Sequence, residues 1–317
     1  MKRALYILAL AFLAVSLVMC KKKEEETTKP SIGGIKLTDP DPFVRAGDRL
    51  TFKVDASNLY TTDQTDPGTL GMYWSLNGTV KDTLSRDISK SLPQIYFSPD
   101  KVGSYTVTVY IYALNGNYYT GSKTASFQAI DPETALKGLE GDENVNIDGN
   151  LYRSTQEGGL TWIANNLYGT PDGRDYRGCE VVSKLFGQYY TWEEARTACP
   201  QGWRLPTAAE FDQALGSAAG ELMVNASFMG EDMWPYWPQV TISNKRLFNA
   251  IPTGYMDLTT EQEVFGYKQY ACWWTADQTA DGELGVFRYI FENQPGVNKG
   301  EGSKTSLALN VRCVKAN

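Results

Sequence analysis

The stretch Tyr190–Phe211, YTWEEARTACPQGWRLPTAAEF, constrains the fold more than any other because it contains two helix starts. Thr191 and Thr207 are each followed three residues later by a glutamate, and this capping-box pattern satisfies orphan N–H groups at a helix N-terminus. Apolar residues at helical spacing follow both starts, and Pro200 and Gly202 end the first helix. The stretch therefore predicts two short amphipathic helices.

Upstream of these helices, residues 35–130 follow the two-residue period of half-buried β-strands. Arg49–Asp55 and Ser104–Tyr112 alternate between apolar and polar side chains along their length. The pairs Asn77-Gly78 and Asn115-Gly116 have the composition of hairpin turns. Short strands at roughly even spacing, separated by turns, predict an all-β sandwich.

The start of the chain reads as a leader peptide for export. Lys2 and Arg3 precede an apolar run that ends at Met19, and this run is short for a membrane span. Residues 1–19 are therefore expected to be a signal peptide. The sequence Leu17-Val-Met-Cys20 resembles a bacterial lipobox, which implies cleavage before Cys20 and lipid on its sulfur. The alternative is an ordinary leader followed by an unmodified cysteine.

Residues 20–34 have the composition of a charged tether without a core, since three lysines and three glutamates follow the cysteine directly. An acidic stretch at this position resembles the surface-export signal of lipoproteins from Bacteroidota. The resemblance implies that outer-membrane lipid is a partner through acylated Cys20. We therefore expect a lipid-anchored protein on the outer face of the outer membrane.

Composition excludes several functional classes. The net charge of the chain is −7, and it contains no basic run interleaved with aromatic residues, so nucleic acid is not an expected partner. The sequence contains no histidine, which excludes Ser-His-Asp catalysis, Cys-His catalysis and histidine-containing zinc sites. A pair of carboxylates for glycoside hydrolysis stays open, because only their separation in space tests it.

The C-terminal half carries several motifs of rare residues in one order. They are Asp148–Tyr152, Thr161–Leu167, Tyr190–Ala195, Ala198–Pro206, Phe248–Tyr255, Trp273–Thr275 and Val311–Lys315. Together these motifs resemble the Fibrobacter succinogenes major paralogous domain over about Asn144–Asn317. The resemblance implies an α+β domain of the C-type-lectin-like fold in an exported, surface-anchored bacterial protein. The resemblance therefore indicates the fold and the cellular location of the protein, and it does not indicate a particular reaction.

The sandwich segment also resembles a known type of domain. Ala46-Gly-Asp48 and Pro99–Val107 are similar to segments of polycystic-kidney-disease (PKD) type and related immunoglobulin-like domains. We therefore expect a PKD/Ig-like β-sandwich over residues 35–130, a linker over 131–143 and a C-type-lectin-like domain over 144–317. The expected fold class is an all-β sandwich followed by an α+β domain.

The cysteines allow more than one pattern of bonds. With Cys20 acylated, four cysteines remain, and their count alone permits three pairings. In the C-type-lectin-like fold a cysteine on the first helix bridges to the last strand, so the resemblance implies a disulfide between Cys199 and Cys313. Cys179 and Cys272 would then form a second pair or remain as packed or free thiols.

The resemblance also implies where a ligand binds, since recognition in this fold uses the irregular region between the helices and the last strands. Here that region covers about residues 220–310. Aromatic side chains suit stacking on sugar rings, and the candidates are Trp234, Tyr236, Trp237, Tyr255 and Tyr267. Trp273 and Trp274 are expected instead in a core strand.

No cofactor is expected, because the sequence lacks the triplets that bind calcium in true C-type lectins. Asp277, Asp281 and Glu283 are the weak candidates for a calcium ion at an acidic hairpin tip. The sequence thus predicts a non-enzymatic surface lipoprotein that binds extracellular glycan or protein. The alternatives are a structural or tip subunit of a surface or fimbrial assembly, an enzyme similar to the formylglycine-generating enzymes, and a glycan-acting enzyme.

Overall fold

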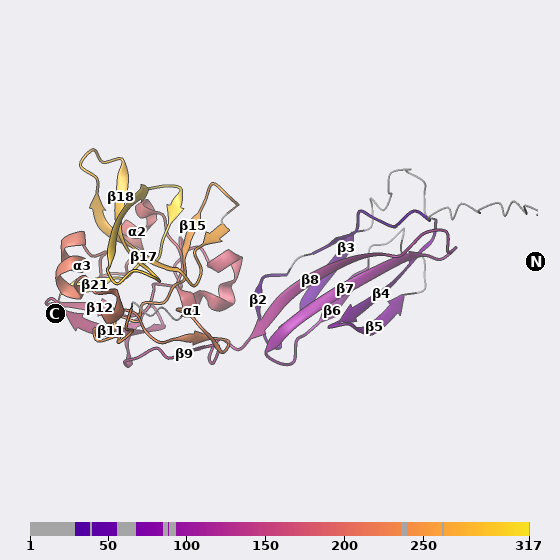
Figure 1. The fold of residues 1–317 in the computed structure, drawn as a ribbon, viewed down its shortest axis with the longest axis horizontal. Coiled ribbons are helices and arrows are strands. Elements are labelled where there is room, and N and C mark those ends of the chain that lie inside the picture. The colour runs from indigo at the N-terminus through magenta and orange to yellow at the C-terminus, as the bar shows by residue number, and fades with distance from the viewer. Residues whose placement is uncertain are drawn as a thin grey trace, which may run out of the picture.

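The computed structural model describes residues 29–38, 40–55, 68–84, 88, 93–235, 240–261 and 263–316. Figure 1 shows a β-sandwich, built from β1 to β8, and a lobe that contains the helices and the remaining strands. We call the second part the C-terminal lobe. The described chain is mostly β-structure arranged in several sheets, and the lobe follows directly after β8.

The sandwich consists of two sheets with the strand orders β1-β3-β6 and β2-β8-β7-β4-β5. Its strands are β1 (Lys36–Leu37), β2 (Phe43–Arg45), β3 (Leu50–Asp55), β4 (Leu70–Leu76), β5 (Thr79–Leu84), β6 (Gln94–Phe97), β7 (Gly103–Ala113) and β8 (Gly121–Ile130). All pairings are antiparallel among the described strands except that β2 lies parallel to β8. The strands predicted at Arg49–Asp55 and Ser104–Tyr112 are confirmed.

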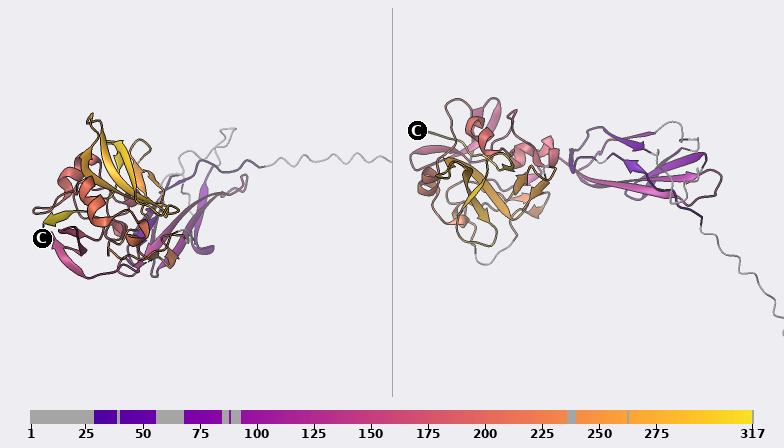
Figure 2. Two further views of the ribbon diagram at one scale, coloured as in Figure 1. Left: turned by 60° about the vertical axis from the view of Figure 1, so that its left-hand side comes forward. Right: turned by 90° about the horizontal axis from the view of Figure 1, so that it is seen from above.

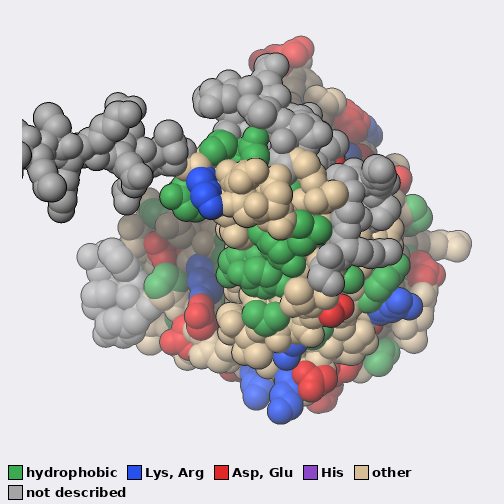
Figure 3. Space-filling view, turned by 90° about the vertical axis from the view of Figure 1, so that its right-hand side faces the viewer, with side chains coloured by type: hydrophobic (Ala, Val, Ile, Leu, Met, Phe, Trp, Pro, Cys, Tyr) green, Lys and Arg blue, Asp and Glu red, His purple; other side chains and the backbone are tan. Residues whose placement is uncertain are grey.

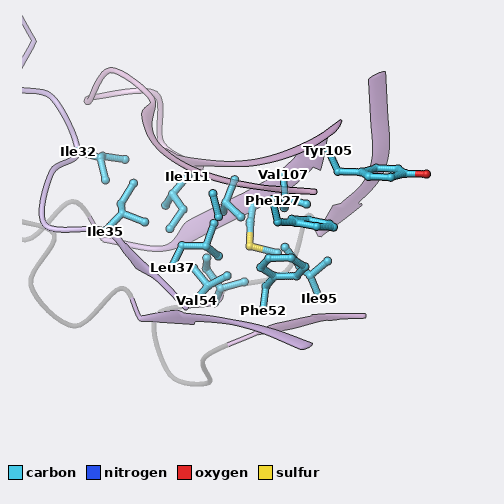
Figure 4. Packing of buried hydrophobic residues seen from close by; sticks show 14 of the residues in the cluster. Ile32, Ile35, Leu37, Phe52, Val54, Ile95, Tyr105, Val107, Ile111 and Phe127 are labelled. Carbon is cyan, nitrogen blue, oxygen red and sulfur yellow. The ribbon is translucent and has the colours of Figure 1, made fainter. Parts of the chain in front are cut away.

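Inward-facing side chains of the two sheets meet in one apolar core (Figure 4). Val107 and Ile111 of β7 are fully buried and pack in one cluster with Phe52 and Val54 of β3. Each such side chain contributes about 1.5–3 kcal/mol when it leaves water. Tyr105 lies at the margin of this core, and its hydroxyl donates to the carbonyl of residue 101 at 2.8 Å. The period-two pattern therefore encodes the core directly.

Figure 3 looks onto the free end of the sandwich, where apolar side chains gather at the centre and charged side chains lie toward the margin. Leu114 and Tyr119 of the turn between β7 and β8 are 42% and 53% exposed. The predicted turn at Asn115-Gly116 is present in this connection.

The C-terminal lobe has short elements joined by long irregular segments. Its helices are α1 (Ser183–Phe186), α2 (Trp192–Ala198) and α3 (Ala208–Leu215). Its strands are β9 (Leu136–Lys137), β10 (Glu143–Ile147), β11 (Asn150–Glu157), β12 (Leu160–Ile163), β13 (Ser227–Phe228), β14 (Glu231–Asp232), β15 (Tyr255–Asp257), β16 (Glu263–Phe265), β17 (Tyr270–Gln278), β18 (Leu284–Phe291), β19 (Asn298–Ser303), β20 (Leu307–Ala308) and β21 (Val314–Ala316). The sheets are β10-β11-β12-β21, β14-β13-β9, β16-β15-β20 and β17-β18-β19.

Both predicted helix starts are confirmed. Thr191 with Glu194, and Thr207 with Glu210, form complete capping boxes at the N-termini of α2 and α3. In the second box Arg204 also donates to both carboxylate oxygens of Glu210, at 2.7 and 2.5 Å. Hydrogen bonds from Arg204 first, and from Thr207 as well, lower the pKa of Glu210 to about 2.

A disulfide joins the end of α2 to the end of the chain. Cys199 and Cys313 have an S–S distance of 2.08 Å and are separated by 114 residues in the sequence. The residue after Cys313 begins β21, which pairs with β12 near the start of the lobe. The bridge therefore fixes the C-terminal strand beside the first hairpin of the lobe, as the family resemblance implies.

Arg312, next to the disulfide, is a buried cation held by neutral groups. Burial lowers the pKa of its guanidinium to about 9. It donates to the side-chain oxygen of Asn166 at 2.9 Å and to the carbonyls of Phe248 and Asn249 at 2.9 and 3.1 Å. It also lies over the ring of Phe248, 4.5 Å from the centroid. Arg312 thereby connects three segments that lie far apart in the sequence.

The sandwich and the C-terminal lobe share apolar contacts. Phe43 of β2 lies 6.0 Å from the ring of Tyr176 and 5.3 Å from the ring of Phe228. Ile130 and Ala135 are buried in the same cluster. Residues 131–143, expected as a linker, thus contribute Ala135 to this core and supply β9, which pairs with β13.

Candidate functional site

The paired strands β17 and β18 carry alternating side chains to two different environments. Figure 2 shows the helices beside this sheet, and α3 contacts both strands. The register pairs Tyr270 with Phe291, Cys272 with Tyr289 and Trp274 with Phe287. Directly opposed residues of an antiparallel pair point to the same face. This face is therefore aromatic, and it lies away from α3.

The aromatic face lines a cavity of about 320 Å³ between the sheet β17-β18-β19 and the sheet β16-β15-β20. The residues that line this cavity, which we call the aromatic cleft, are Tyr255, Tyr270, Cys272, Phe287, Tyr289, Lys299, Gly300, Leu307 and Leu309. Its walls come from both sheets and are predominantly aromatic or aliphatic. Such a concave, mostly apolar lining with a few polar groups is typical of ligand sites.

Five rings form a continuous row along the cleft, in the order Phe265, Tyr255, Tyr270, Tyr289 and Phe287. Consecutive ring centroids lie 6.0, 5.9, 6.1 and 5.8 Å apart. Phe265 is 36% exposed, and the four other rings are half-buried. We call this arrangement the aromatic row. Neighbouring rings of the row are stacked, tilted or edge-on to one another, and part of each ring remains accessible.

Two glycines allow rings of the row to lie directly against the backbone. A Cβ atom added to Gly300 would lie 2.2 Å from Cζ of Phe287, the residue opposite it in the register. A Cβ atom on Gly266 would lie 2.5 Å from Cδ2 of Tyr270, and Gly266 also has a φ of 68°. Larger residues at these positions would push the rings toward the cleft.

The groups at the floor of the cleft are neutral near pH 7. Burial raises the pKa of the Cys272 thiol. Burial first, and then the nearby Tyr255, Tyr289, Cys272 and Glu292, raise the pKa of Tyr270. A protonated thiol is a weak nucleophile. The floor of the cleft is therefore suited to contact with an uncharged surface.

The opposite face of β17 and β18 is scaffold. Trp273 is 1% exposed and donates its indole N–H to the side-chain oxygen of Asn166 at 3.0 Å. Arg288 is also buried, and its guanidinium donates to both carboxylate oxygens of Asp212 in α3, at 2.7 and 2.8 Å. Trp273 on this face and Trp274 on the face toward the cleft are both buried, which confirms the expectation that they lie in a core strand.

Two of the described ligand candidates from the sequence require correction. Trp234 is 4% exposed, and its indole N–H donates to the carbonyl of Ala250 at 2.9 Å, so it belongs to the core. Tyr267 is half-buried and packs against Tyr176 and Phe186, with centroids 5.5 and 5.7 Å away, outside the cleft lining. Burial removes Trp234 from the candidate site, and its position away from the cleft removes Tyr267.

Tyr255 is the described candidate that does line the cleft. Tyr236 and Trp237 lie outside the described residues, as does Cys20. The sequence reasoning left Phe287 and Tyr289 out of the site. Their alternation in Phe287-Arg-Tyr-Ile-Phe291 was the available signal, because it places three aromatic rings on one face of a strand.

The acidic hairpin does not gather its carboxylates into one site. Asp277 accepts from the backbone N–H of Ala208 at 2.6 Å and so binds the N-terminus of α3. Asp281 accepts from the Thr279 hydroxyl at 2.5 Å and from the Glu283 N–H at 3.1 Å within the turn. Over the described ranges, histidine, cysteine and acidic side chains form no group of three or more with metal-binding geometry.

Cys179 and Cys272 are free thiols, which corrects the idea of a second pair. They are buried in two different apolar clusters, so their sulfurs do not meet. Burial raises the pKa of Cys179 to about 11. Both residues act as small apolar side chains in the packing.

In the described part of the chain, the helices are all too short or too polar for a membrane span.

Two solved structures show weak similarity to this chain. A CARDB domain from Pyrococcus furiosus aligns with 14% identity and a TM-score of 0.18, covering 30% of this chain and 89% of that one. The adhesin InvE of Yersinia pseudotuberculosis aligns with 10% identity and a TM-score of 0.27, covering 90% of this chain and 70% of that one. No curated protein sequence matches this chain significantly.

Family membership is clear from the sequence itself. The sequence model of the Fibrobacter succinogenes major domain matches residues 114–315, which is more than half of the chain. The matched range begins in the turn before β8 and includes nearly all of the C-terminal lobe, with the disulfide and the aromatic cleft. The protein therefore belongs to the Fibrobacter succinogenes major domain family.

Proposed function

We propose that the C-terminal lobe binds carbohydrate in the aromatic cleft. The observation that carries the proposal is the aromatic row, in which four half-buried rings line one cavity of about 320 Å³ and the exposed Phe265 continues the row beyond it. Sugar rings have apolar C–H faces that stack on aromatic rings, and their edges carry hydroxyl groups. The cleft offers both kinds of contact, because three of the five rings are tyrosines whose hydroxyls donate and accept hydrogen bonds.

Stacking requires no metal ion, so the proposed recognition differs from that of calcium-dependent lectins. The absence of histidine from the sequence and the protonated Cys272 thiol support a binding role without catalysis. We expect binding to be unchanged by a chelator. Affinity should respond instead to the rings themselves.

The test is binding of the purified full-length protein to arrays of plant, mucin and bacterial glycans, with calcium and with chelator. Tyr289→Ala should lower the affinity for a glycan that binds by roughly tenfold, the loss expected for one stacked ring. Tyr289→Phe retains the ring and should keep most of the affinity. Tyr96→Ala is the matched control, since Tyr96 is 51% exposed on the sandwich. The proposal would be overturned if the protein bound none of the glycans, or if Tyr289→Ala left the affinity unchanged.

The proposal includes finer statements about architecture. The C-terminal lobe would be C-type-lectin-like, which is supported by the pairing of β21 with β12, the two capped helices and the Cys199–Cys313 bridge. The sandwich would be a PKD/Ig-like spacer, which is supported by its two packed sheets. An experimental structure whose lobe superposes on C-type lectins would support this part, and a different topology would overturn it.

We also propose that Cys20 carries lipid and anchors the protein to the outer face of the outer membrane. The support is the lipobox-like sequence and the acidic stretch that follows it. Metabolic labelling with palmitate should mark the wild-type protein and should not mark Cys20→Ser. Protease treatment of intact cells should cleave the anchored protein, and resistance to it would contradict the surface location.

A further inference from the structure

We infer that the aromatic cleft selects an uncharged oligosaccharide in preference to a single sugar and to acidic glycans. This inference rests on the proposed function, since it names the class of carbohydrate that the same cleft would accept. Two independent features carry it. One is the length of the aromatic row, and the other is the distribution of charge around it.

The aromatic row is longer than one sugar ring. A pyranose ring is about the size of one aromatic side chain, whereas the row has five rings at centroid spacings of 6.0, 5.9, 6.1 and 5.8 Å. Phe265 lies at one end on β16, and Phe287 lies at the other on β18. Phe265 is exposed and lies outside the cavity lining, so it extends the contact surface beyond the cleft. A chain of sugars can use the whole row, and a monosaccharide can use only part of it.

Fixed negative charge lies on the face that carries one end of the row. Asp257 and Glu263 are opposite each other in the pairing of β15 with β16, and they share a face with Tyr255 and Phe265. Hydrogen bonds from the side chain and the backbone of Thr259 lower the pKa of Asp257, so this carboxylate is charged at neutral pH. A ligand carboxylate or sulfate on this face would therefore meet like charge.

Lys299, which belongs to the cleft lining, and Lys268, which lies two residues before Tyr270 in the sequence, are already paired with carboxylates. The ammonium of Lys299 lies 3.4 Å from Asp212 in α3, on the opposite side of the sheet from the row. The ammonium of Lys268 lies 2.7 Å from the carboxylate of Glu231. Glu292 adds a further acid close to Tyr270. An uncharged sugar can stack on the rings without electrostatic repulsion, whereas an acidic sugar that stacks there is repelled by these carboxylates.

Charge selection is tested with neutral β-glucan, mannan, xylan and galactan, each beside a carboxymethylated form of matched length, against the full-length protein. The neutral polymer that binds best should bind roughly tenfold more tightly than its carboxymethylated form at low salt, and high salt should narrow the ratio. Equal affinity for both forms would overturn the charge inference and leave carbohydrate binding intact. Failure of all eight polymers to bind would count against the proposed function itself.

Variants separate the charge effect from a general change in the cleft. The double variant Asp257→Asn, Glu263→Gln should raise affinity for the carboxymethylated polymer severalfold and leave affinity for the neutral one unchanged. Glu301→Gln is the matched control, because Glu301 is exposed on the opposite face of β19. An equal gain from Glu301→Gln would show that net charge, and not the cleft, sets the preference.

Length selection is tested with oligomers of one to six units from the same neutral polymer. Affinity should rise with each unit and level off only when the row is covered. Phe265→Ala should weaken binding of the hexamer severalfold and leave the shortest oligomer that binds unaffected. Near-ultraviolet circular dichroism confirms that the variant is folded, which its exposed position favours. Equal affinity for the monomer and the hexamer would overturn the length inference.

Discussion

The two faces of the β17–β18 sheet use aromatic residues in opposite ways. The face toward α3 buries Trp273, whose indole N–H is held by Asn166, together with Ile290. The face toward the cleft carries Tyr270 and Tyr289, which remain half-buried. One strand pair therefore contributes both to the scaffold and to the candidate site. The difference shows that aromatic content alone does not locate a ligand site, because the accessibility of each ring decides.

The described tryptophans of the lobe reinforce this contrast. Indole N–H groups that are buried require an acceptor, and five of them have one. Four of these N–H groups donate to backbone carbonyls: Trp162 to Glu157 at 3.2 Å, Trp192 to Thr275 at 3.0 Å, Trp234 to Ala250 at 2.9 Å and Trp274 to Tyr190 at 2.8 Å. The fifth, from Trp273, donates to the side-chain oxygen of Asn166 at 3.0 Å. These side chains are positioned by the fold and give it specificity. The cleft uses tyrosine and phenylalanine instead.

Removal of the disulfide should cause the largest loss of stability. The bridge packs in the apolar cluster that also contains Cys272 of the cleft lining. Cys313 packs in the same apolar cluster as Cys272 and Trp274. For a loop of 114 residues, the chain-entropy model gives a loss of about 4–5 kcal/mol in the free energy of unfolding for Cys199→Ser with Cys313→Ser. Denaturant titration measures it, and adding reductant to the double variant should cause no further loss. A loss below about 1 kcal/mol would contradict the prediction.

Truncation on the two faces should separate stability from binding. Trp273→Ala should lower the free energy of unfolding by about 3–5 kcal/mol, because it leaves a large cavity between α3 and the sheet. Tyr289→Ala should cost much less stability, since its ring is already partly in water, while it weakens glycan binding. The two variants can be compared by denaturant titration and by binding to the same glycan. Equal destabilisation by both would remove the distinction between the two faces.

A larger residue at Gly300 tests whether glycan binding depends on the exact position of the Phe287 ring in the aromatic row. Gly300→Ala places a methyl group against the ring of Phe287, which must move because the contact would be 2.2 Å. We expect a cost of about 1–3 kcal/mol and a severalfold loss of glycan affinity. Gly296→Ala is the matched control, since its Cβ would meet only a backbone oxygen at 3.7 Å. Binding that is unchanged by Gly300→Ala would mean that Phe287 does not contact the ligand.

The smallest effect that we predict is a loss of folding stability at acid pH, caused by protonation of the carboxylate in the capping box of α3. The folded-state pKa of Glu210 is lowered from 4.5 to about 2, so its stabilisation is complete above about pH 4.5 and is lost as the pH falls toward 2. Thr207→Ala should lower stability by about 1 kcal/mol at neutral pH. Melting temperatures between pH 2 and 6 should fall less steeply for Glu210→Gln than for wild type. Parallel curves would contradict this role of the carboxylate.

The sequence predicts the regular parts of the fold well because they depend on local patterns. Alternation fixed the long strands of the sandwich, and side-chain chemistry at Thr191 and Thr207 fixed the helix starts. The short strands β9, β13 and β14 were not predicted, since two-residue segments have no detectable period. Their structure depends on contacts between distant segments of the chain.

The candidate site was predicted only in part for a related reason. The sequence predicts Trp234 as a ligand contact because it is an aromatic residue in the irregular region, but tertiary packing buries its ring and pairs its N–H with the carbonyl of Ala250. Tyr255 was predicted and lines the cleft. The row itself combines β15, β16, β17 and β18, and the distances between these strands are absent from any local sequence pattern.

The parallel pairing of β2 with β8 has a mechanical consequence. Phe43–Arg45 lies beside Gln128–Ile130, and the chain enters β2 at one end of this ladder and leaves β8 at the other. A pulling force between the N-terminal side and the C-terminal lobe would therefore load the ladder in shear, so its hydrogen bonds would resist together and not break one after another. The bonds that bear this load include Gln128 N–H to the Pro42 carbonyl at 2.9 Å and Ala46 N–H to the Ile130 carbonyl at 2.8 Å. A protein that holds a ligand at one end and is tethered at the other would resist extension at this short ladder.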